Sequence, residues 1–291
     1  MSLTSFINIP RIREMFSTNI PKPKIKIESD ILAPPLTKNY SIVGIAFDYL
    51  LRMFLKRINT NAIEGPWIAE ILLTVPFSPI LNDAVIKSAE GEPGRVIEYK
   101  ETELTKYLKQ ILLKCKDQYS KFLQSGKITD KLLEDFLLLS QFDPFFRTGR
   151  VFDIKHNVDK KDIKDLRNLI SLLHSKQSLF ISKEHCLLNP TFGEASKMIG
   201  GADADVVIDD IIIDIKTTIK AAFTRYQFNQ ILGYYLLNSI GGIDGINKKV
   251  KINRIGIYYS RFGEMLLVPI KNIIEEDKMN NFLEWFKKEI E

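Results

Sequence analysis

The stretch from Gly200 to Thr218, GGADADVVIDDIIIDIKTT, places acidic side chains beside a run of Val and Ile that is typical of a protein core. Asp205 precedes VVI, Asp214 follows III, and Lys216 stands two residues later. Carboxylates held close together either raise the pKa of one of them or bind a cation between them. Oxygen ligands without a nearby Cys favour Mg²⁺ or Mn²⁺. The stretch is therefore either a solvated hairpin or a metal site.

The register of this hairpin favours the metal site. Asp is a common turn residue, so we expect the chain to reverse at Asp209 and Asp210. The expected partners across the hairpin are Ile208 and Ile211, Val206 and Ile213, Asp205 and Asp214, and Asp203 and Lys216. Side chains alternate along a strand, so one face is wholly apolar and the other gathers the charges. Because Val and Ile continue on both sides of the facing carboxylates, a cation between them is favoured over a face in water.

This arrangement resembles the PD-(D/E)XK nuclease superfamily, in which an acidic residue on one strand and a (D/E)-x-K triplet on its neighbour hold the catalytic metal. Asp205 and the triplet from Asp214 to Lys216 match that pattern. Gln230 and Tyr234 follow as Q-x-x-x-Y in RYQFNQILGYYLL, similar to the third motif of RecB-type exonucleases. The stretch GIAFD, which ends at Asp48, is similar to the opening G-x-x-x-H motif of those nucleases, with Asp in place of His.

The resemblance implies a restriction-endonuclease-like core of class α/β (α+β), a short mixed β-sheet flanked by helices, with a large helical insertion. It implies a Mg²⁺- or Mn²⁺-dependent nuclease of RecB-like kind that hydrolyses phosphodiester bonds of DNA, with RNA not excluded. The implied metal ligands are Asp205, Asp214 and the main-chain carbonyl of Ile215, with Asp203 and Asp48 as further candidates. The implied catalytic residues are Lys216, Gln230 and Tyr234. Lys216 would orient or deprotonate the attacking water, and the other two would position the lysine or a phosphate.

Basic residues near these motifs are candidates for nucleic-acid binding. They are Lys220, Arg225, Lys248, Lys249, Lys251 and Arg254. The net charge of +5 permits a nucleic-acid partner without demanding one. Two alternatives to the nuclease stay open: a non-catalytic nucleic-acid-binding or scaffolding protein on the same fold, and a metal-dependent phosphohydrolase of small molecules. The intact Asp/Asp/Lys set favours the nuclease.

The elements that must position these residues follow a simple order along the chain. Four prolines between residues 21 and 35 predict an extended N-terminal arm over 1–40. A single nuclease-like domain follows over 41–291, and it opens with a helix at 41–58. Apolar stripes over 103–124, 129–142 and 159–175 predict helices within an insertion at about 78–180. The catalytic core, about 181–291, has strand patterns at 186–192, 202–209, 210–218, 252–260 and 264–270. Helices are expected at about 220–239 and from about 271.

Composition narrows the class further. A chain of 291 residues with 45% hydrophobic and 26% charged residues is typical of a globular protein. Its two cysteines, Cys115 and Cys186, are too few for a disulfide framework or a four-cysteine iron–sulfur cluster. No stretch approaches the roughly 20 apolar residues that span a bilayer. We therefore expect a cytoplasmic protein with no membrane partner.

Overall fold

The computed structural model describes residues 2–74, 83–86, 97–100, 103–144, 154–246 and 250–291. The chain divides into two compact units, the first made of residues 1–35, 54–65 and 168–291 and the second of 36–53 and 66–167. Residues 41–291, expected to form a single domain, thus contribute to both units. In α3 (Tyr40–Ile58), Tyr49 packs edge-on against Trp67 with 5.3 Å between ring centroids and packs tilted against Phe136 at 5.9 Å, and all three residues belong to the second unit.

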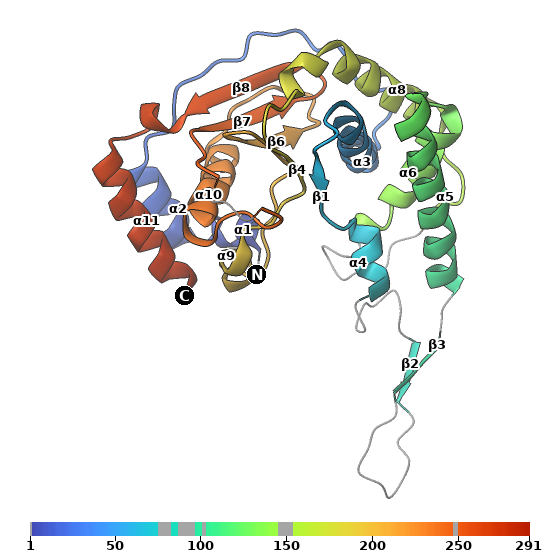
Figure 1. Ribbon diagram of the computed structural model, residues 1–291, viewed down its shortest axis with the longest axis horizontal. Coiled ribbons are helices and arrows are strands. Elements are labelled where there is room, and N and C mark those ends of the chain that lie inside the picture. Colours follow the sequence, from blue (N-terminus) through green and yellow to red (C-terminus); the bar gives the residue numbers. More distant parts are fainter. Residues whose placement is uncertain (1, 75–82, 87–96, 101–102, 145–153, 247–249) are drawn as a thin grey trace, which may run out of the picture. The chain divides into compact units, whose positions relative to one another are not determined.

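A six-stranded mixed sheet forms the centre of the first unit (Figure 1). Its strands are β1 (Ile63–Glu64), β4 (Cys186–Leu188), β5 (Val206–Ile208), β6 (Ile211–Lys216), β7 (Arg254–Tyr259) and β8 (Glu264–Pro269). Their spatial order is β1-β4-β5-β6-β7-β8, with β1/β4 and β6/β7 parallel and the remaining pairs antiparallel. The α/β class is confirmed, as are the five strands expected from residue 186 onward.

Helices cover one face of this sheet (Figure 1). They are α1 (Leu3–Phe6), α2 (Pro10–Asn19), α9 (Gly193–Met198), α10 (Arg225–Gly241) and α11 (Glu276–Ile290). The register aligns one row of core residues across five strands: Leu187, Val207, Ile212, Ile255 and Val268. Asp214 and Lys216 follow Ile212 by two and four positions on β6. Because side chains alternate, both are on the face that the helices cover.

The N-terminal arm is shorter than the sequence predicts. Residues 3–6 and 10–19 form helices α1 and α2, and the extended chain begins only after them. Pro10 occupies the first turn of α2, where its missing N–H is not needed and its fixed φ suits a helix. Phe16 of α2 is fully buried against Phe282 of α11, with 5.1 Å between ring centroids. Apolar packing therefore makes residues 10–19 helical despite the prolines that follow.

The remaining elements mostly follow the expected pattern. They are α4 (Ile68–Thr74), α5 (Glu103–Ser125), α6 (Asp130–Ser140), α8 (Lys160–Ser175), and the short turns η1 (Gln177–Phe180) and η2 (Ile270–Asn272). The three helices expected between 103 and 175 are confirmed. An antiparallel pair, β2 (Asp83–Ile86) and β3 (Ile97–Lys100), lies inside the section expected to be a helical insertion, whose predicted start at 78 is outside the described residues. Among the described helices, none is long and apolar enough to cross a membrane.

Candidate active site

The hairpin of β5 and β6 has the register that its sequence predicts. Val206 pairs with Ile213, Val207 with Ile212 and Ile208 with Ile211, with Asp209 and Asp210 between the strands. Asp209 adopts a left-handed backbone conformation with φ 51°. Its carboxylate accepts hydrogen bonds from the main-chain N–H groups of Lys183, Glu184 and His185, at 2.8 to 3.1 Å. The turn is therefore fixed to the segment that leads into β4.

The ladder between β5 and β6 stops where the acidic residues begin. The Asp205 carboxylate accepts a hydrogen bond from the Ile215 main-chain N–H at 2.6 Å, so a side chain takes the position of the next ladder bond. On its other side, the Asp205 carbonyl accepts from Asn189 N–H at 2.9 Å. Asp203, expected opposite Lys216, instead forms an isolated antiparallel bridge with Thr191. This local opening fixes the Asp205 carboxylate beside the Asp214–Lys216 segment.

A continuous series of polar contacts joins β6 to α10. Lys216 Nζ lies 2.7 Å from Asp214 Oδ2 and donates a hydrogen bond to Gln230 Oε1 at 3.2 Å. Gln230 Nε2 in turn donates to the Tyr234 hydroxyl at 3.0 Å. Asp214 is 3% exposed and Lys216 is 20% exposed, so the ion pair lies at the inner end of a site that retains access to solvent. Tyr234 is buried and stacks on Phe192 with 5.7 Å between centroids.

The charges of this cluster act on one another. Burial lowers the pKa of Lys216, but the Asp214 and Asp205 carboxylates outweigh it, and the net pKa is raised above the ordinary value. Burial raises the pKa of Tyr234 well above its ordinary value, and the carboxylates of Asp214, Asp205 and Asp203 raise it further. All three carboxylates therefore lie within electrostatic range of one hydroxyl. The repulsion expected between Asp205 and Asp214 is offset here by the Lys216 ammonium.

Two residues beside this cluster were not among the candidates from the sequence. Tyr259 on β7 pairs in register with Lys216, and its hydroxyl donates to Gln227 Oε1 at 3.2 Å. Burial, and after it the charge of Asp214, raises the pKa of Tyr259 to about 12. Tyr226 stands four residues before Gln230, a helical spacing that could have been noticed. The position of Tyr259 depends on the β6–β7 register and has no signal in the local sequence.

The basic candidates fall into three groups. Lys248 and Lys249 lie outside the described residues. Arg254 pairs with Asp210, at 2.5 Å between Nη2 and Oδ1, and it is opposite Ile211 in the parallel β6–β7 register. Ile211 lies at the other end of β6 from Lys216, roughly 16 Å along the strand. Arg254 is therefore not beside the site as expected, and Lys251 lines the same surface cavity as Arg254.

The remaining two basic candidates follow β6 in the chain: Lys220 lies on the loop between β6 and α10, and Arg225 is the first residue of α10. Lys220 is exposed, and its carbonyl accepts from the Thr218 hydroxyl at 2.9 Å. The Arg225 guanidinium donates to the Ile20 carbonyl at 2.9 Å and lies 5.5 Å from the centre of the Phe228 ring. This loop directly follows the strand of Asp214 and Lys216. Of the four basic candidates that the structure describes, these two are therefore connected most directly to the candidate site.

The oxygen atoms of the site suit a hard cation. Two carboxylates, Asp205 and Asp214, and the main-chain oxygen of Ile215 are of the type that Mg²⁺ and Mn²⁺ prefer. In the part of the chain that the structure describes, no three His, Cys, Asp or Glu side chains form a metal-binding cluster. A cation here would therefore depend on two carboxylates, with main-chain and water oxygens completing its shell, as is usual for Mg²⁺.

Asp48, the further metal candidate on α3, belongs to the second unit. Its carboxylate accepts a hydrogen bond from Arg52, one helical turn later, at 2.8 Å. This contact explains an acidic residue at that position without a metal. A metal-binding role for Asp48 stays a prediction.

Comparison of the chain with protein-family models, curated proteins and solved structures finds no match. The assignment of a function therefore depends on the site itself.

Proposed function

We propose that the protein is a Mg²⁺- or Mn²⁺-dependent nuclease that hydrolyses phosphodiester bonds of DNA, with a RecB-like site of the PD-(D/E)XK type on a restriction-endonuclease-like core. One observation carries the proposal. Lys216 Nζ contacts both Asp214, at 2.7 Å, and Gln230, at 3.2 Å. These three residues come from the two motifs, D-x-K and Q-x-x-x-Y, that the resemblance rests on, and they meet in one place.

Further features support this assignment. Asp205, the residue before β5, directs its carboxylate to the backbone between Asp214 and Lys216. In the PD-(D/E)XK nucleases that the site resembles, an acidic residue on the strand beside the D-x-K strand holds the metal. Tyr234 completes the Q-x-x-x-Y motif and hydrogen bonds to Gln230. Asp205 and the four residues of the two motifs, Asp214, Lys216, Gln230 and Tyr234, are thus connected by short-range contacts.

The chemistry assigned to each residue follows from its contacts. A cation bound by Asp205, Asp214 and the Ile215 carbonyl would polarise a phosphate oxygen and lower the pKa of a bound water. The raised pKa of Lys216 keeps its amine charged at neutral pH. The lysine therefore supplies positive charge to the pentavalent phosphate as it forms and orients the attacking water. Gln230 fixes the amine, and Tyr234, which stays protonated, fixes Gln230.

A second candidate function is a non-catalytic nucleic-acid-binding protein on the same fold. The observation that favours it is the ion pair itself, because the Lys216 ammonium already compensates the buried Asp214 carboxylate. A protein that never binds a metal would need such a partner for Asp214. The two functions differ in one respect: only the nuclease requires the ion pair to coexist with a bound divalent cation.

The test is cleavage of labelled single-stranded, duplex and branched DNA, and of RNA, in Mg²⁺, in Mn²⁺ and in EDTA. We expect cleavage that requires the divalent cation and is lost in Asp214→Ala. Asp210→Ala is the matched control, because Asp210 is a carboxylate of the same hairpin that pairs with Arg254 at the other end of the strand. A folded wild type that is inert on every substrate would favour the binding protein.

A further inference from the structure

The start of α10 is firmly held, yet it leaves one aromatic ring in solvent. Thr224 and Gln227 form a capping box: Thr224 Oγ1 accepts from Gln227 N–H at 3.2 Å, and Gln227 Oε1 accepts from Thr224 N–H at 3.0 Å. Tyr259 adds a further hydrogen bond to Gln227. Tyr226 lies between these two fixed residues and is 43% exposed. Its ring is therefore presented to solvent on a rigid helical turn.

The exposed ring lies on the side of α10 that faces the candidate site. Tyr226, Gln230 and Tyr234 are each four residues apart, a spacing that places them on one helix face. Gln230 contacts Lys216, so Tyr226 stands one turn further toward the start of the helix on that side. The pKa of Lys216 is lowered by burial, raised by the two carboxylates and raised further by Tyr226, which agrees with this position. The stripe thus runs from buried Tyr234 to exposed Tyr226.

Two cations are held beside this helical turn by a reciprocal clamp. Lys22 Nζ donates to the Phe223 carbonyl at 2.9 Å, and Arg225 donates to the Ile20 carbonyl at 2.9 Å. Burial lowers the pKa of Lys22, and the charge of Arg225 lowers it further, so the two like charges lie close together. Their partners in these bonds are neutral carbonyl groups. An anion bound between them would relieve this repulsion.

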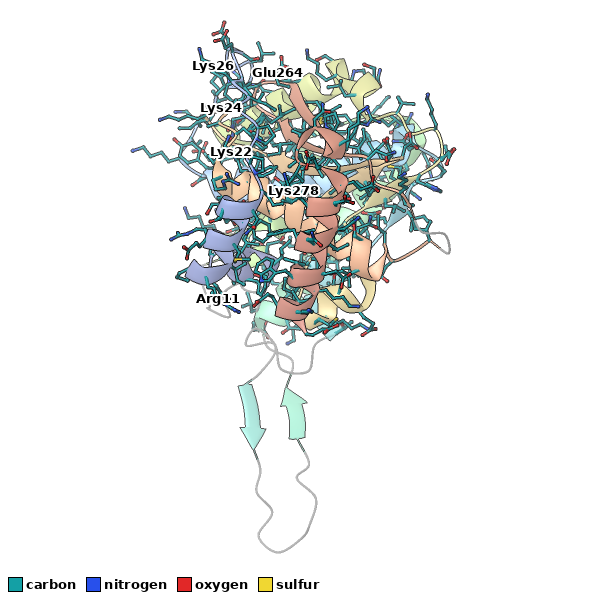
Figure 2. All side chains as sticks on the ribbon, turned by 90° about the vertical axis from the view of Figure 1, so that its left-hand side faces the viewer. Arg11, Lys22, Lys24, Lys26, Glu264 and Lys278 are labelled. Carbon is teal, nitrogen blue, oxygen red and sulfur yellow. The ribbon has the colours of Figure 1, made fainter. Side chains whose placement is uncertain are left out.

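The arm continues the line of positive charge. Lys24 and Lys26 follow Lys22 at alternate positions and are exposed, while Ile25 and Ile27 pack against the core. Figure 2 shows Lys22, Lys24 and Lys26 in succession along the arm. Lys26 is partly neutralised by an ion pair with Glu28, so the positive charge of the arm is greatest at Lys22 and Lys24. The phosphate backbone of a nucleic acid is the polyanion that suits such a line.

We propose that Tyr226, with the Lys22–Arg225 clamp, binds a single-stranded segment of nucleic acid next to the Lys216 site. The ring stacks on a base, and the two cations hold neighbouring phosphates. This inference rests on the proposed function and adds the strandedness of its substrate. Proteins that bind single strands without sequence preference combine basic side chains along the backbone with aromatic rings on which bases stack. Within a duplex each base is already stacked and paired, so its face is closed to Tyr226.

The test is the binding of a fluorescent oligothymidine and of a duplex of equal length, measured by anisotropy in EDTA so that no cleavage takes place. Stacking on one base contributes about 1–3 kcal/mol, so Tyr226→Ala should weaken single-strand binding roughly five- to hundredfold. Tyr226→Phe should bind like wild type, because the ring and not the hydroxyl stacks. Tyr40→Ala is the matched control, since Tyr40 is 44% exposed and also stands at the start of a long helix.

Each outcome of this test decides the inference. Wild-type affinity in Tyr226→Ala would overturn it, as would equal losses in Tyr226→Ala and Tyr40→Ala. Preference of the wild type for duplex, or no binding of either oligonucleotide, would also overturn it. A selective loss in Tyr226→Ala supports it, whether or not the wild type cleaves in Mg²⁺. Failure of the nuclease proposal is therefore distinguishable from failure of the proposal that Tyr226 binds single-stranded nucleic acid.

Discussion

Lys216→Met removes the positive charge from a site with two carboxylates while it keeps a side chain of similar length. The Lys216 amine lies 2.7 Å from Asp214, whose side chain is 3% exposed. Removal of one partner from a buried ion pair costs about 3–5 kcal/mol, because the other charge stays buried. Lys216 keeps partial access to water, so we expect a loss of about 2–3 kcal/mol in the free energy of unfolding.

The assay is urea unfolding in EDTA at neutral pH, arranged as a double-mutant cycle with Asp214→Asn. The double variant Asp214→Asn/Lys216→Met should be more stable than Lys216→Met alone, because it no longer buries an uncompensated carboxylate. Lys197→Met is the control: it breaks an ion pair with Glu194 in which both side chains are more than 70% exposed. This control should not move the unfolding midpoint measurably.

Divalent metal should reverse the effect of Lys216→Met. A cation that binds only the native state stabilises it by an amount that reaches about 2.7 kcal/mol at a hundred times its dissociation constant. Wild-type stability of Lys216→Met in EDTA would refute the buried ion pair. A loss in the free energy of unfolding that neither Mg²⁺ nor Mn²⁺ recovers would support the buried ion pair and refute the metal site.

Three further outcomes follow from particular contacts. Burial alone would raise the pKa of Asp209, but three main-chain N–H groups lower it, so its stabilising effect is present above the unfolded-state pKa and is lost as the pH falls through the lower folded-state pKa. Asp209→Ala should therefore cost about 2 kcal/mol at pH 7 in urea unfolding, and the cost should decline as the pH falls below the unfolded-state pKa; a cost that does not change with pH would contradict this. The fully buried Arg261 side chain donates to the Ala33 carbonyl, and the Arg261 carbonyl accepts from the main chain of Leu32 and Ala33. Arg261→Met removes only the side-chain bond, so it should loosen the arm and speed tryptic cleavage after Lys24 about tenfold; an unchanged rate would show that this bond does not hold the arm. Gln230→Ala should slow DNA cleavage about tenfold with metal affinity retained in a titration, and an unchanged rate would remove Gln230 from the site.

The parts of the site that the sequence predicts are those set by local periodicity. Alternation of apolar and polar residues about Asp209 fixes the register of the hairpin, because a slip by one residue would exchange its two faces. Helical spacing likewise places Gln230 and Tyr234 on one side of α10. Both features need only a few consecutive residues, so tertiary structure does not override them.

The parts that the sequence does not predict depend on contacts between distant segments. The parallel pairing of β6 with β7 places Arg254 beside Ile211, at the far end of β6 from Lys216, and places Tyr259 beside Lys216. No local pattern encodes the register of a crossover that includes a whole helix. The same holds for Lys22, which reaches the Phe223 carbonyl from a segment 201 positions earlier. The proline-rich composition around it predicts an extended chain but not what that chain contacts.

The rate of DNA cleavage by Lys216→Ala, relative to wild type, in saturating Mg²⁺ tests the proposed mechanism most directly. The wild type should cleave only with divalent metal, and the variant should be at least about a hundredfold slower with its metal affinity nearly intact. Such a result would show that Lys216 acts in the cleavage step and is not required for metal binding. Equal cleavage by the two proteins in Mg²⁺ would contradict the role that the geometry assigns to Lys216.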